Sequence, residues 1–284
     1  MPMKNPSKIF NLMRTENLAI ASFAGLAVLV AAIGGAVIFY GDQAKAAISK
    51  VSSGGEGSAA LVKVAVKTAD PSADIFRLRA APMQGWTEVS LTTGEGQDQL
   101  IYVANDGGQM IVGNVIDVAA KKSLTFEAVN KARVELVAKA PADARITFKA
   151  PDERRVLYAF TDTDCDACKV MHDAIGTLNS AGVTVHYLPF PRGDLGGKGF
   201  GELSTALCSK EPTKTFTAAI AGDIEVTPEC AQKVLDGYRL GTRLAVEGVP
   251  TLVLDDGRQL PGFPDAAKVL AEMGLAVPAS VTGS

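Results

Sequence analysis

The stretch that decides the fold is "VLYAFTDTDCDACKVMHDAIGTLNSAG", residues 156–182. Its first part belongs to an apolar, aromatic run that predicts a buried strand over residues 155–160. Its second part predicts a helix over residues 165–182, with a C-cap near Gly182. Two cysteines with two residues between them, Cys165 and Cys168, therefore stand where a strand gives way to a helix.

A cysteine pair of this kind has four uses, and the neighbouring residues separate them. Covalent haem needs a histidine directly after the second cysteine, where Lys169 stands instead. A zinc site needs about four ligands, and Cys165, Cys168 and His172 supply three with no second CxxC downstream. A structural bridge between cysteines three apart closes almost no loop, so it removes little unfolded-state entropy. Redox use is favoured, and a metal-binding module is the weaker alternative.

The position of the pair supports redox chemistry. The start of a helix offers free backbone N–H groups and the positive end of the helix dipole, which favour a thiolate. We therefore expect Cys165 to attack and the less exposed Cys168, one turn further on, to resolve. Asp164 and Asp166 oppose a thiolate, although acids suit a helix start, so we expect a milder oxidant than a pair flanked by neutral residues would give.

The two histidines are expected to be structural. His172 lies seven residues after Cys165, roughly 10 Å along a helix, which is too far for a direct hydrogen bond. A contact on the helix surface or between domains is expected instead. His186 falls in a predicted strand.

"EGVPTLVL", residues 247–254, carries the second part of the candidate site. A proline directly before a buried strand loses a ladder donor, so it needs a reason to be there. In redox folds of this plan the proline is cis and packs against the CxxC, and we expect the same of Pro250, with the peptide group before it, at Val249, free to pair with a substrate strand. An ordinary trans proline at a strand start is the alternative.

The other two cysteines, Cys208 and Cys230, are 22 residues apart in a helical, polar stretch. A bridge between them would contribute roughly 3 kcal/mol in the chain-entropy model. We predict a structural disulfide, with a second redox relay as the alternative.

The order of elements from residue 145 onward is typical of an α/β domain. The helical stretch forms an insert at about 194–241, between the third strand and a hairpin. The predicted strands, hairpin and closing helix are 145–150, 155–160, 183–190, 251–262 and 265–274, with Asp265 as the last helix's cap.

Residues 61–120 predict a small β-rich unit. Strands are expected at 86–93 and 99–106, with a hairpin turn at 105–108. Roughly 60 residues make a thin core, which favours pairing with a second copy over a monomeric packing domain. A linker follows over residues 121–144, containing a helix at 124–139 that Ser123 caps.

The N-terminus predicts export. Residues 1–16 are basic on balance, with Lys4, Lys8 and Arg14 against Glu16, and from Leu18 to Tyr40 no residue is charged. That apolar stretch would cover roughly 35 Å as a helix, enough to span a bilayer. The positive-inside rule puts the basic segment in the cytoplasm and the rest outside.

We therefore predict a transmembrane anchor at 17–40 and a flexible tether at 41–60. A cleaved signal peptide is the alternative, because Ala44-Lys45-Ala46 has the small-x-small shape of a cleavage site. A net charge of −3 without a basic patch gives no support for a nucleic-acid partner.

Four segments together resemble the periplasmic disulfide isomerases of the DsbC/DsbG type, in the thioredoxin superfamily. The resemblance covers residues 61–275, and its motifs are specific as a set. It is carried by "AFTDTDCDACKVMH" (159–172), "YLPFPRG" (187–193), "LIYVANDGGQMIVGNVIDV" (100–118) and the arrangement of the second cysteine pair.

The resemblance implies an α+β protein with a small cystatin-like β-rich dimerisation domain, a linker helix and a C-terminal thioredoxin-like domain. It implies a homodimer that isomerises or reduces wrong disulfides in misfolded exported proteins, without a cofactor or metal. Cys165 would be kept reduced by a membrane thiol reductase of the DsbD type. The location would be the periplasm, with the N-terminal helix holding this variant to the inner membrane.

Three departures from the family pattern bear on the redox direction and location. Val249 stands where the isomerases tend to have threonine, and it is similar to the oxidase branch. The interior of the CxxC is Asp166-Ala167, not an uncharged pair, and a spanning anchor replaces a simple signal. A dithiol oxidase, and a periplasmic chaperone or assembly scaffold with secondary redox activity, are the alternative functions.

Overall fold

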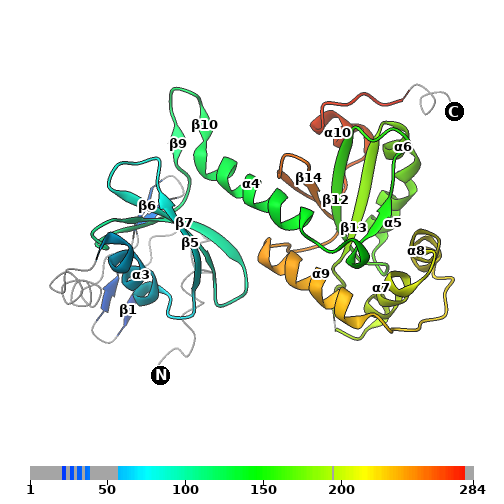
Figure 1. The fold of residues 1–284 in the computed structure, drawn as a ribbon, viewed down its shortest axis with the longest axis horizontal. Coiled ribbons are helices and arrows are strands. Elements are labelled where there is room, and N and C mark those ends of the chain that lie inside the picture. Colours follow the sequence, from blue (N-terminus) through cyan, green and yellow to red (C-terminus); the bar gives the residue numbers. More distant parts are fainter. Residues whose placement is uncertain are drawn as a thin grey trace. The chain divides into compact units, whose positions relative to one another are not determined.

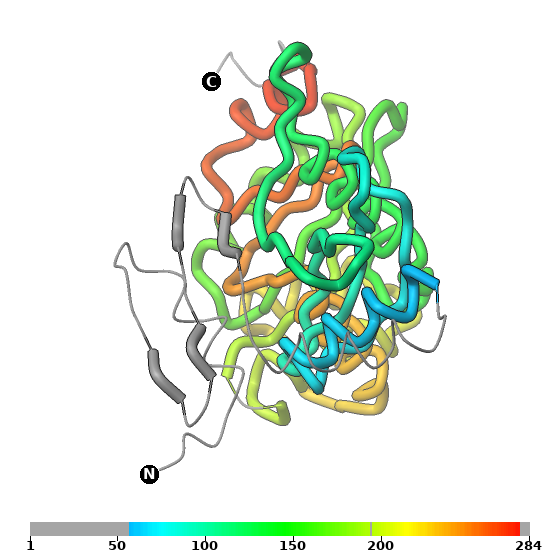
Figure 2. Tube along the Cα trace, turned by 90° about the vertical axis from the view of Figure 1, so that its left-hand side faces the viewer, coloured from blue at the N-terminus to red at the C-terminus, as the bar shows by residue number. Residues whose placement is uncertain are grey.

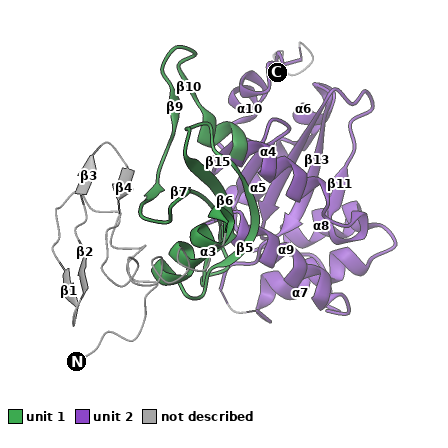
Figure 3. Ribbon diagram, turned by 60° about the vertical axis from the view of Figure 1, so that its left-hand side comes forward, with its two compact units in different colours: residues 1–128 green, residues 129–284 purple. Residues whose placement is uncertain are grey.

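The computed structural model describes residues 57–193 and 195–278. Before them it gives only the backbone of four short strands: β1 (Ala21–Phe23), β2 (Leu26–Val28), β3 (Ala31–Ile33) and β4 (Ala36–Ile38). The predicted basic segment 1–16, the anchor at 17–40 and most of the tether at 41–60 lie outside the fully described residues. Among the described helices, none is both long and apolar enough to cross a bilayer. The chain divides into two compact units, residues 1–128 and 129–284 (Figure 3).

The N-terminal unit packs one helix on an antiparallel sheet. Strands β5 to β8 lie in the order β8-β7-β6-β5. Their bounds are Asp74–Ala80, Trp86–Thr92, Asp98–Ala104 and Met110–Val112. Helix α3 (Ser58–Ala69) buries Val62, Ala65 and Val66, whose helical spacing forms one apolar face. That face packs against the strand residues Val89 and Ile101.

Helix α3 and strand β5 of this unit were not predicted. Helix α3 occupies residues assigned to the tether and to the start of the β-rich unit, and strand β5 follows it. Strand β8 and the two-residue strand β9 (Ile116–Asp117) follow the hairpin turn. The turn itself lies where it was expected. Gly107, within it, takes a φ of +72°, a backbone conformation that suits glycine.

Helix α4 (Leu124–Ala138) begins after the two-residue strand β10 (Lys122–Ser123) and continues into the second unit. Its start is capped as predicted, because the backbone N–H of Phe126 donates to the Ser123 hydroxyl at 3.1 Å. Near its other end Val137 is buried in the core of the C-terminal unit. A single 3-10 turn, η2 (Ala142–Ala144), leads from there to the second sheet.

The C-terminal unit has a five-stranded mixed sheet in the order β11-β13-β12-β14-β15. Strands β12 and β13 run parallel, and every other neighbouring pair is antiparallel. The bounds are Ile146–Phe148 (β11), Arg155–Thr161 (β12), Val183–Pro189 (β13), Thr251–Leu254 (β14) and Gln259–Pro261 (β15). Figure 1 shows this sheet with helices packed beside it, and Figure 2 traces the chain after a turn of 90°.

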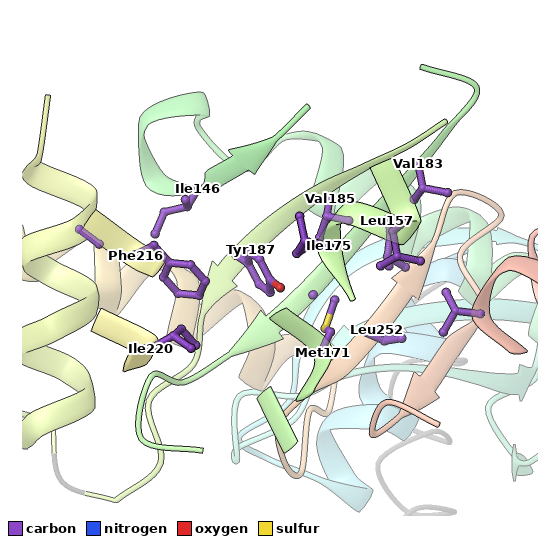
Figure 4. Close-up of a cluster of buried hydrophobic side chains, with 14 of the residues drawn as sticks. Ile146, Leu157, Met171, Ile175, Val183, Val185, Tyr187, Phe216, Ile220 and Leu252 are labelled. Carbon is purple, nitrogen blue, oxygen red and sulfur yellow. The ribbon is translucent and has the colours of Figure 1, made fainter. Parts of the chain in front are cut away.

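Side chains of the central strand β12 alternate between two cores. Leu157 and Ala159 face the larger core, where Met171 and Ile175 from the helices after the CxxC pack on the sheet (Figure 4). Tyr158 and Phe160 face the smaller core on the opposite side. The CxxC therefore follows a strand that is buried on both faces.

The helix predicted over residues 165–182 is two helices, α5 (Asp166–Asp173) and α6 (Ile175–Ser180). They separate at Ala174, whose N–H bonds the carbonyl of Met171 three residues back, so the regular four-residue ladder is interrupted. The predicted C-cap holds, since Gly182 has a φ of +88°.

Three helices form the insert before β14. They are α7 (Lys198–Cys208), α8 (Pro212–Ala221) and α9 (Ala231–Arg243). After the β14–β15 hairpin the described chain closes with α10 (Ala266–Glu272), where Asp265 accepts the N–H of Lys268 at 2.7 Å. This capping contact agrees with the sequence prediction.

Candidate active site

Cys165 is the N-cap of α5, and its sulfur accepts the backbone N–H of Cys168 at 3.3 Å. A serine or aspartate usually occupies such a position and satisfies one of the free N–H groups of the first turn. Here a sulfur takes that place. Both cysteines are free thiols. Any negative charge on Cys165 would therefore face a hydrogen-bond donor and the positive end of the helix.

The Val249–Pro250 peptide bond is cis, as predicted, and lies against Cys165. The Cys165 thiol donates to the Val249 carbonyl at 3.6 Å. Strand β14 begins directly after this proline, so the start of this strand lies beside the sulfur of Cys165. A surface cavity of about 420 Å³ borders the same peptide and is also lined by Glu247, Gln259 and Pro261.

The two thiols of the CxxC are not equivalent. Cys168 is completely buried, and Cys165 keeps 3% of its surface exposed. Burial, followed by the hydrogen bond with Cys165, raises the pKa of Cys168 to about 12. Cys168 is therefore held as a neutral thiol while the pair is reduced.

An aspartate just before the pair organises the loop, and the sequence analysis did not single it out. Asp162 is 1% exposed. Its carboxylate accepts the N–H of Asp164 at 3.2 Å and the N–H of Arg192 at 2.8 Å. The Arg192 guanidinium lies 3.7 Å from the same carboxylate and donates to the Asp164 carbonyl.

Helix α7 completes this arrangement. A Cβ on Gly199 would lie 2.0 Å from an Asp162 oxygen, so only glycine fits there. Asp162 and Arg192 both lie in segments that carry the family resemblance, 159–172 and 187–193, and this was the one sign in the sequence that they matter. The sequence could not show that these two segments contact each other in the fold.

The two acids beside Cys165 point to solvent. The Asp166 side chain is fully exposed and lies 3.6 Å from Lys169, one turn along the helix. Asp164 is also exposed. Their charges act on Cys165 through water, which weakens the opposition to a thiolate that the sequence suggested.

Among the described residues, neither His172 nor His186 forms a hydrogen bond with Cys165. His172 contacts the hydroxyls of Tyr187 at 3.4 Å and Thr217 at 3.0 Å, and burial lowers its pKa. His186 bonds the Thr147 hydroxyl at 2.8 Å, and burial lowers its pKa to about 4. No cluster of three metal-ligating side chains occurs within the described ranges.

The second cysteine pair forms a disulfide. Cys208 ends α7 and Cys230 is the N-cap of α9, and their Cα atoms are 5.6 Å apart. This is the predicted pairing. It ties the first and last helices of the insert together.

Comparison with known proteins gives two family matches along the chain. Residues 41–126 match the disulfide bond isomerase protein N-terminal domain, and residues 141–276 match a thioredoxin-like domain. The residues between these matches, 127–140, lie almost entirely within α4.

Two relatives are similar to this chain over most of its length. The thiol:disulfide interchange protein DsbC of Escherichia coli K12 is 30% identical over 203 residues, which cover 72% of this chain and 80% of that protein. The protein of the same name from Salmonella typhimurium is 32% identical, covering 66% and 75%. A solved structure of Helicobacter pylori DsbG covers 68% of this chain and 98% of its own, at 15% identity and a TM-score of 0.37, too weak a likeness to bear on function.

Proposed function

The chain belongs to the DsbC family of thiol:disulfide interchange proteins, and we propose that it isomerises or reduces wrong disulfides in exported proteins through Cys165. One observation carries the assignment of the nucleophile. The sulfur of Cys165 caps the first turn of α5 and faces the carbonyl of Val249 beside the cis proline. A thiolate, the reactive form of cysteine, is stabilised by that N–H donor and by the helix dipole.

The reaction follows from the two unequal thiols. The Cys165 thiolate attacks one sulfur of a substrate disulfide, forms a mixed disulfide and releases the other substrate sulfur as a thiolate. In isomerisation, another substrate thiol displaces Cys165 and leaves a rearranged substrate disulfide. In reduction, Cys168 displaces the substrate, and the two enzyme sulfurs become a disulfide. Buried and protonated, Cys168 resolves only after the mixed disulfide forms.

Val249 and Pro250 supply the substrate-binding part of the site. The cis peptide holds the Val249 backbone next to Cys165, where an extended substrate segment can pair with it. The adjoining cavity offers room for a substrate side chain next to that backbone.

Isomerase or reductase activity, not net oxidation, is the proposed direction. Exposed carboxylates at Asp164 and Asp166 oppose a thiolate at Cys165, although solvent weakens them. A less stable reduced form makes a weaker oxidant. The match of residues 41–126 to the N-terminal domain of disulfide bond isomerase proteins also supports isomerase activity.

The cellular setting is also a proposal. The apolar, uncharged stretch within residues 17–40 supports an inner-membrane anchor, with a cleaved signal as the alternative. The catalytic residues would then lie in the periplasm, on the thioredoxin-like domain at 145–284. Residues 61–120 would pair with a second copy to form a homodimer, and a membrane thiol reductase of the DsbD type would keep Cys165 reduced.

Refolding of scrambled ribonuclease without added oxidant tests this function. The reduced protein should restore ribonuclease activity in catalytic amounts. Cys165→Ala should abolish the effect, and Cys168→Ala should slow it less, because isomerisation needs one attacking sulfur. Recovery that depends on added oxidant would favour an oxidase, and full recovery with Cys165→Ala would favour a chaperone.

A further inference from the structure

We propose that the Thr161 hydroxyl is a built-in hydrogen-bond donor for the Cys168 thiolate that forms when Cys168 resolves the mixed disulfide. The inference rests on the proposed function and concerns the same site. It assigns a role to a residue that neither cysteine chemistry nor substrate binding has claimed.

The fold places Thr161 on the sheet face that is covered by the helix of the resolving cysteine. It is the last residue of β12, and strand alternation puts it on the same face as Leu157 and Ala159. That face is covered by α5, the helix that carries Cys168. Thr161 is 0% exposed, and so is Cys168.

The Thr161 hydroxyl has no hydrogen-bond partner among the described residues. An unpaired polar group is destabilising when it is buried, so such groups call for an explanation. Its backbone is well placed, because the Thr161 carbonyl accepts the N–H of Phe190 at 2.8 Å. The unpaired hydroxyl is therefore a feature of the side chain alone.

A charge on Cys168 would give that hydroxyl a partner. The hydroxyl of Thr161 and the backbone N–H of Asp162 both lower the pKa of Cys168, against the larger effect of burial. Hydrogen bonds to an ionised group are roughly twice as strong as neutral ones. Thr161 thus gains its bond only in the state that reacts, which is how a preorganised donor speeds a reaction.

The other groups around Cys168 do not supply this donor. Charge on Cys165 opposes charge on Cys168, and charge on Cys168 in turn helps to raise the pKa of Tyr187 on β13. His172, on the same helix, is held neutral by burial and bonds Tyr187 and Thr217. The Asp162 carboxylate is occupied by Arg192.

Thr161 would assist the release of the substrate by Cys168. Cys168 gives up its proton and attacks the Cys165 sulfur of the mixed disulfide. The bond between Cys165 and Cys168 forms, and the bond between Cys165 and the substrate sulfur breaks. The electron pair leaves on the substrate sulfur, which takes up a proton, so the substrate is reduced and the enzyme dithiol is oxidised.

The test separates attack by Cys165 from resolution by Cys168. Reduced full-length protein is mixed with the aromatic disulfide dithionitrobenzoate across a range of pH. The first coloured thiol released reports attack by Cys165, and the second reports displacement by Cys168. The variants are Thr161→Val, which keeps the shape, and Thr161→Ser, which keeps the hydroxyl. Thr163→Val is the matched control, because Thr163 is also buried with an unpaired hydroxyl.

Thr161→Val should slow the second release about tenfold or more and move its pH dependence upward, leaving the first release unchanged. Thr161→Ser and Thr163→Val should behave like the wild type. Because Thr161→Val removes an unpaired hydroxyl, the oxidised variant should be at least as stable to denaturant as the wild type.

The inference is wrong if Thr161→Val releases the second thiol at the wild-type rate with the wild-type pH dependence. It is also wrong if Thr163→Val slows release equally, or if Thr161→Ser fails to restore it, since packing would then be the cause. A wild-type protein that gives no first release would instead overturn the proposed function.

Discussion

Arg192 binds the buried carboxylate of Asp162 twice, through its backbone N–H at 2.8 Å and through its guanidinium at 3.7 Å. The same carboxylate accepts the N–H of Asp164, the residue before the attacking cysteine. A segment following β13 therefore holds the loop that leads from β12 into α5. The position of Cys165 depends on this contact as well as on its own helix.

Removing the carboxylate should therefore affect both stability and reactivity. Asp162→Ala leaves two backbone N–H groups and a guanidinium without their acceptor, so we expect a loss of about 2 kcal/mol in the free energy of unfolding. The attack rate of Cys165 should fall with it, because the loop loosens. Denaturant unfolding and the first release of thionitrobenzoate measure the two effects.

Arg239→Ala is the control for that experiment. Its partner Asp236 is 3.1 Å away, but both side chains are largely exposed, so the loss should be below about 1 kcal/mol. If Asp162→Ala were no more destabilising than Arg239→Ala, the contact with Arg192 would not be what holds the loop.

The disulfide between Cys208 and Cys230 should be structural. The variant with alanine at both positions should lose roughly 3 kcal/mol in the free energy of unfolding, because a loop of 22 residues is no longer closed. Ribonuclease refolding at low temperature should remain, since neither sulfur acts on substrate. A folded double variant that has lost interchange activity would point to a redox relay through this pair.

Stability should fall as the pH drops from about 6.5 to about 4. Burial lowers the pKa of His186 to about 4, so in this window the unfolded chain binds a proton that the folded protein excludes. The stability that His186 contributes is present in full above pH 6.5, its pKa in the unfolded chain, and is lost as the pH falls toward 4. The pKa of His186 differs by about 2.5 between the unfolded and the folded protein, which limits the loss of unfolding free energy to about 3 kcal/mol.

His186→Asn isolates this contribution, because asparagine can still bond Thr147. Unfolding free energies measured between pH 7 and pH 4 should fall less steeply in the variant than in the wild type. Identical slopes in both proteins would show that His186 is not held neutral by the fold.

Removing the acid inside the CxxC should make the protein more oxidising. Asp166→Asn takes away a negative charge next to Cys165, which favours the thiolate of the reduced form. The equilibrium constant with glutathione should shift about twofold to fivefold toward the reduced enzyme, a small change because Asp166 is exposed. Asp173→Asn, at the other end of α5, should shift it less, and an equal or opposite shift would contradict the argument.

Much of the catalytic unit could be predicted from the sequence because its signals are local. An apolar, aromatic run identified β12, the CxxC marked the start of α5, and a proline directly before a buried strand drew attention to Pro250, whose peptide bond is cis. Each of these depends on neighbours within a few positions.

The missed features depend on distant contacts or on competing local signals. Helix α3 carries β-branched valines that do not favour a helix by themselves, and packing on β6 and β7 stabilises it. Asp162 and Arg192 are 30 residues apart and meet only because β12 and β13 are parallel neighbours. The unpaired hydroxyl of Thr161 is visible only when its surroundings are known.

The rate at which iodoacetamide alkylates Cys165, followed against pH in the fully reduced protein, tests the central claim most directly. If Cys165 is a thiolate stabilised by the first turn of α5, it should react at pH 6 at least about tenfold faster than free cysteine. That fast phase should be absent in Cys165→Ala and unaffected in Cys208→Ala/Cys230→Ala. A Cys165 that reacts no faster than free cysteine at any pH would contradict the account.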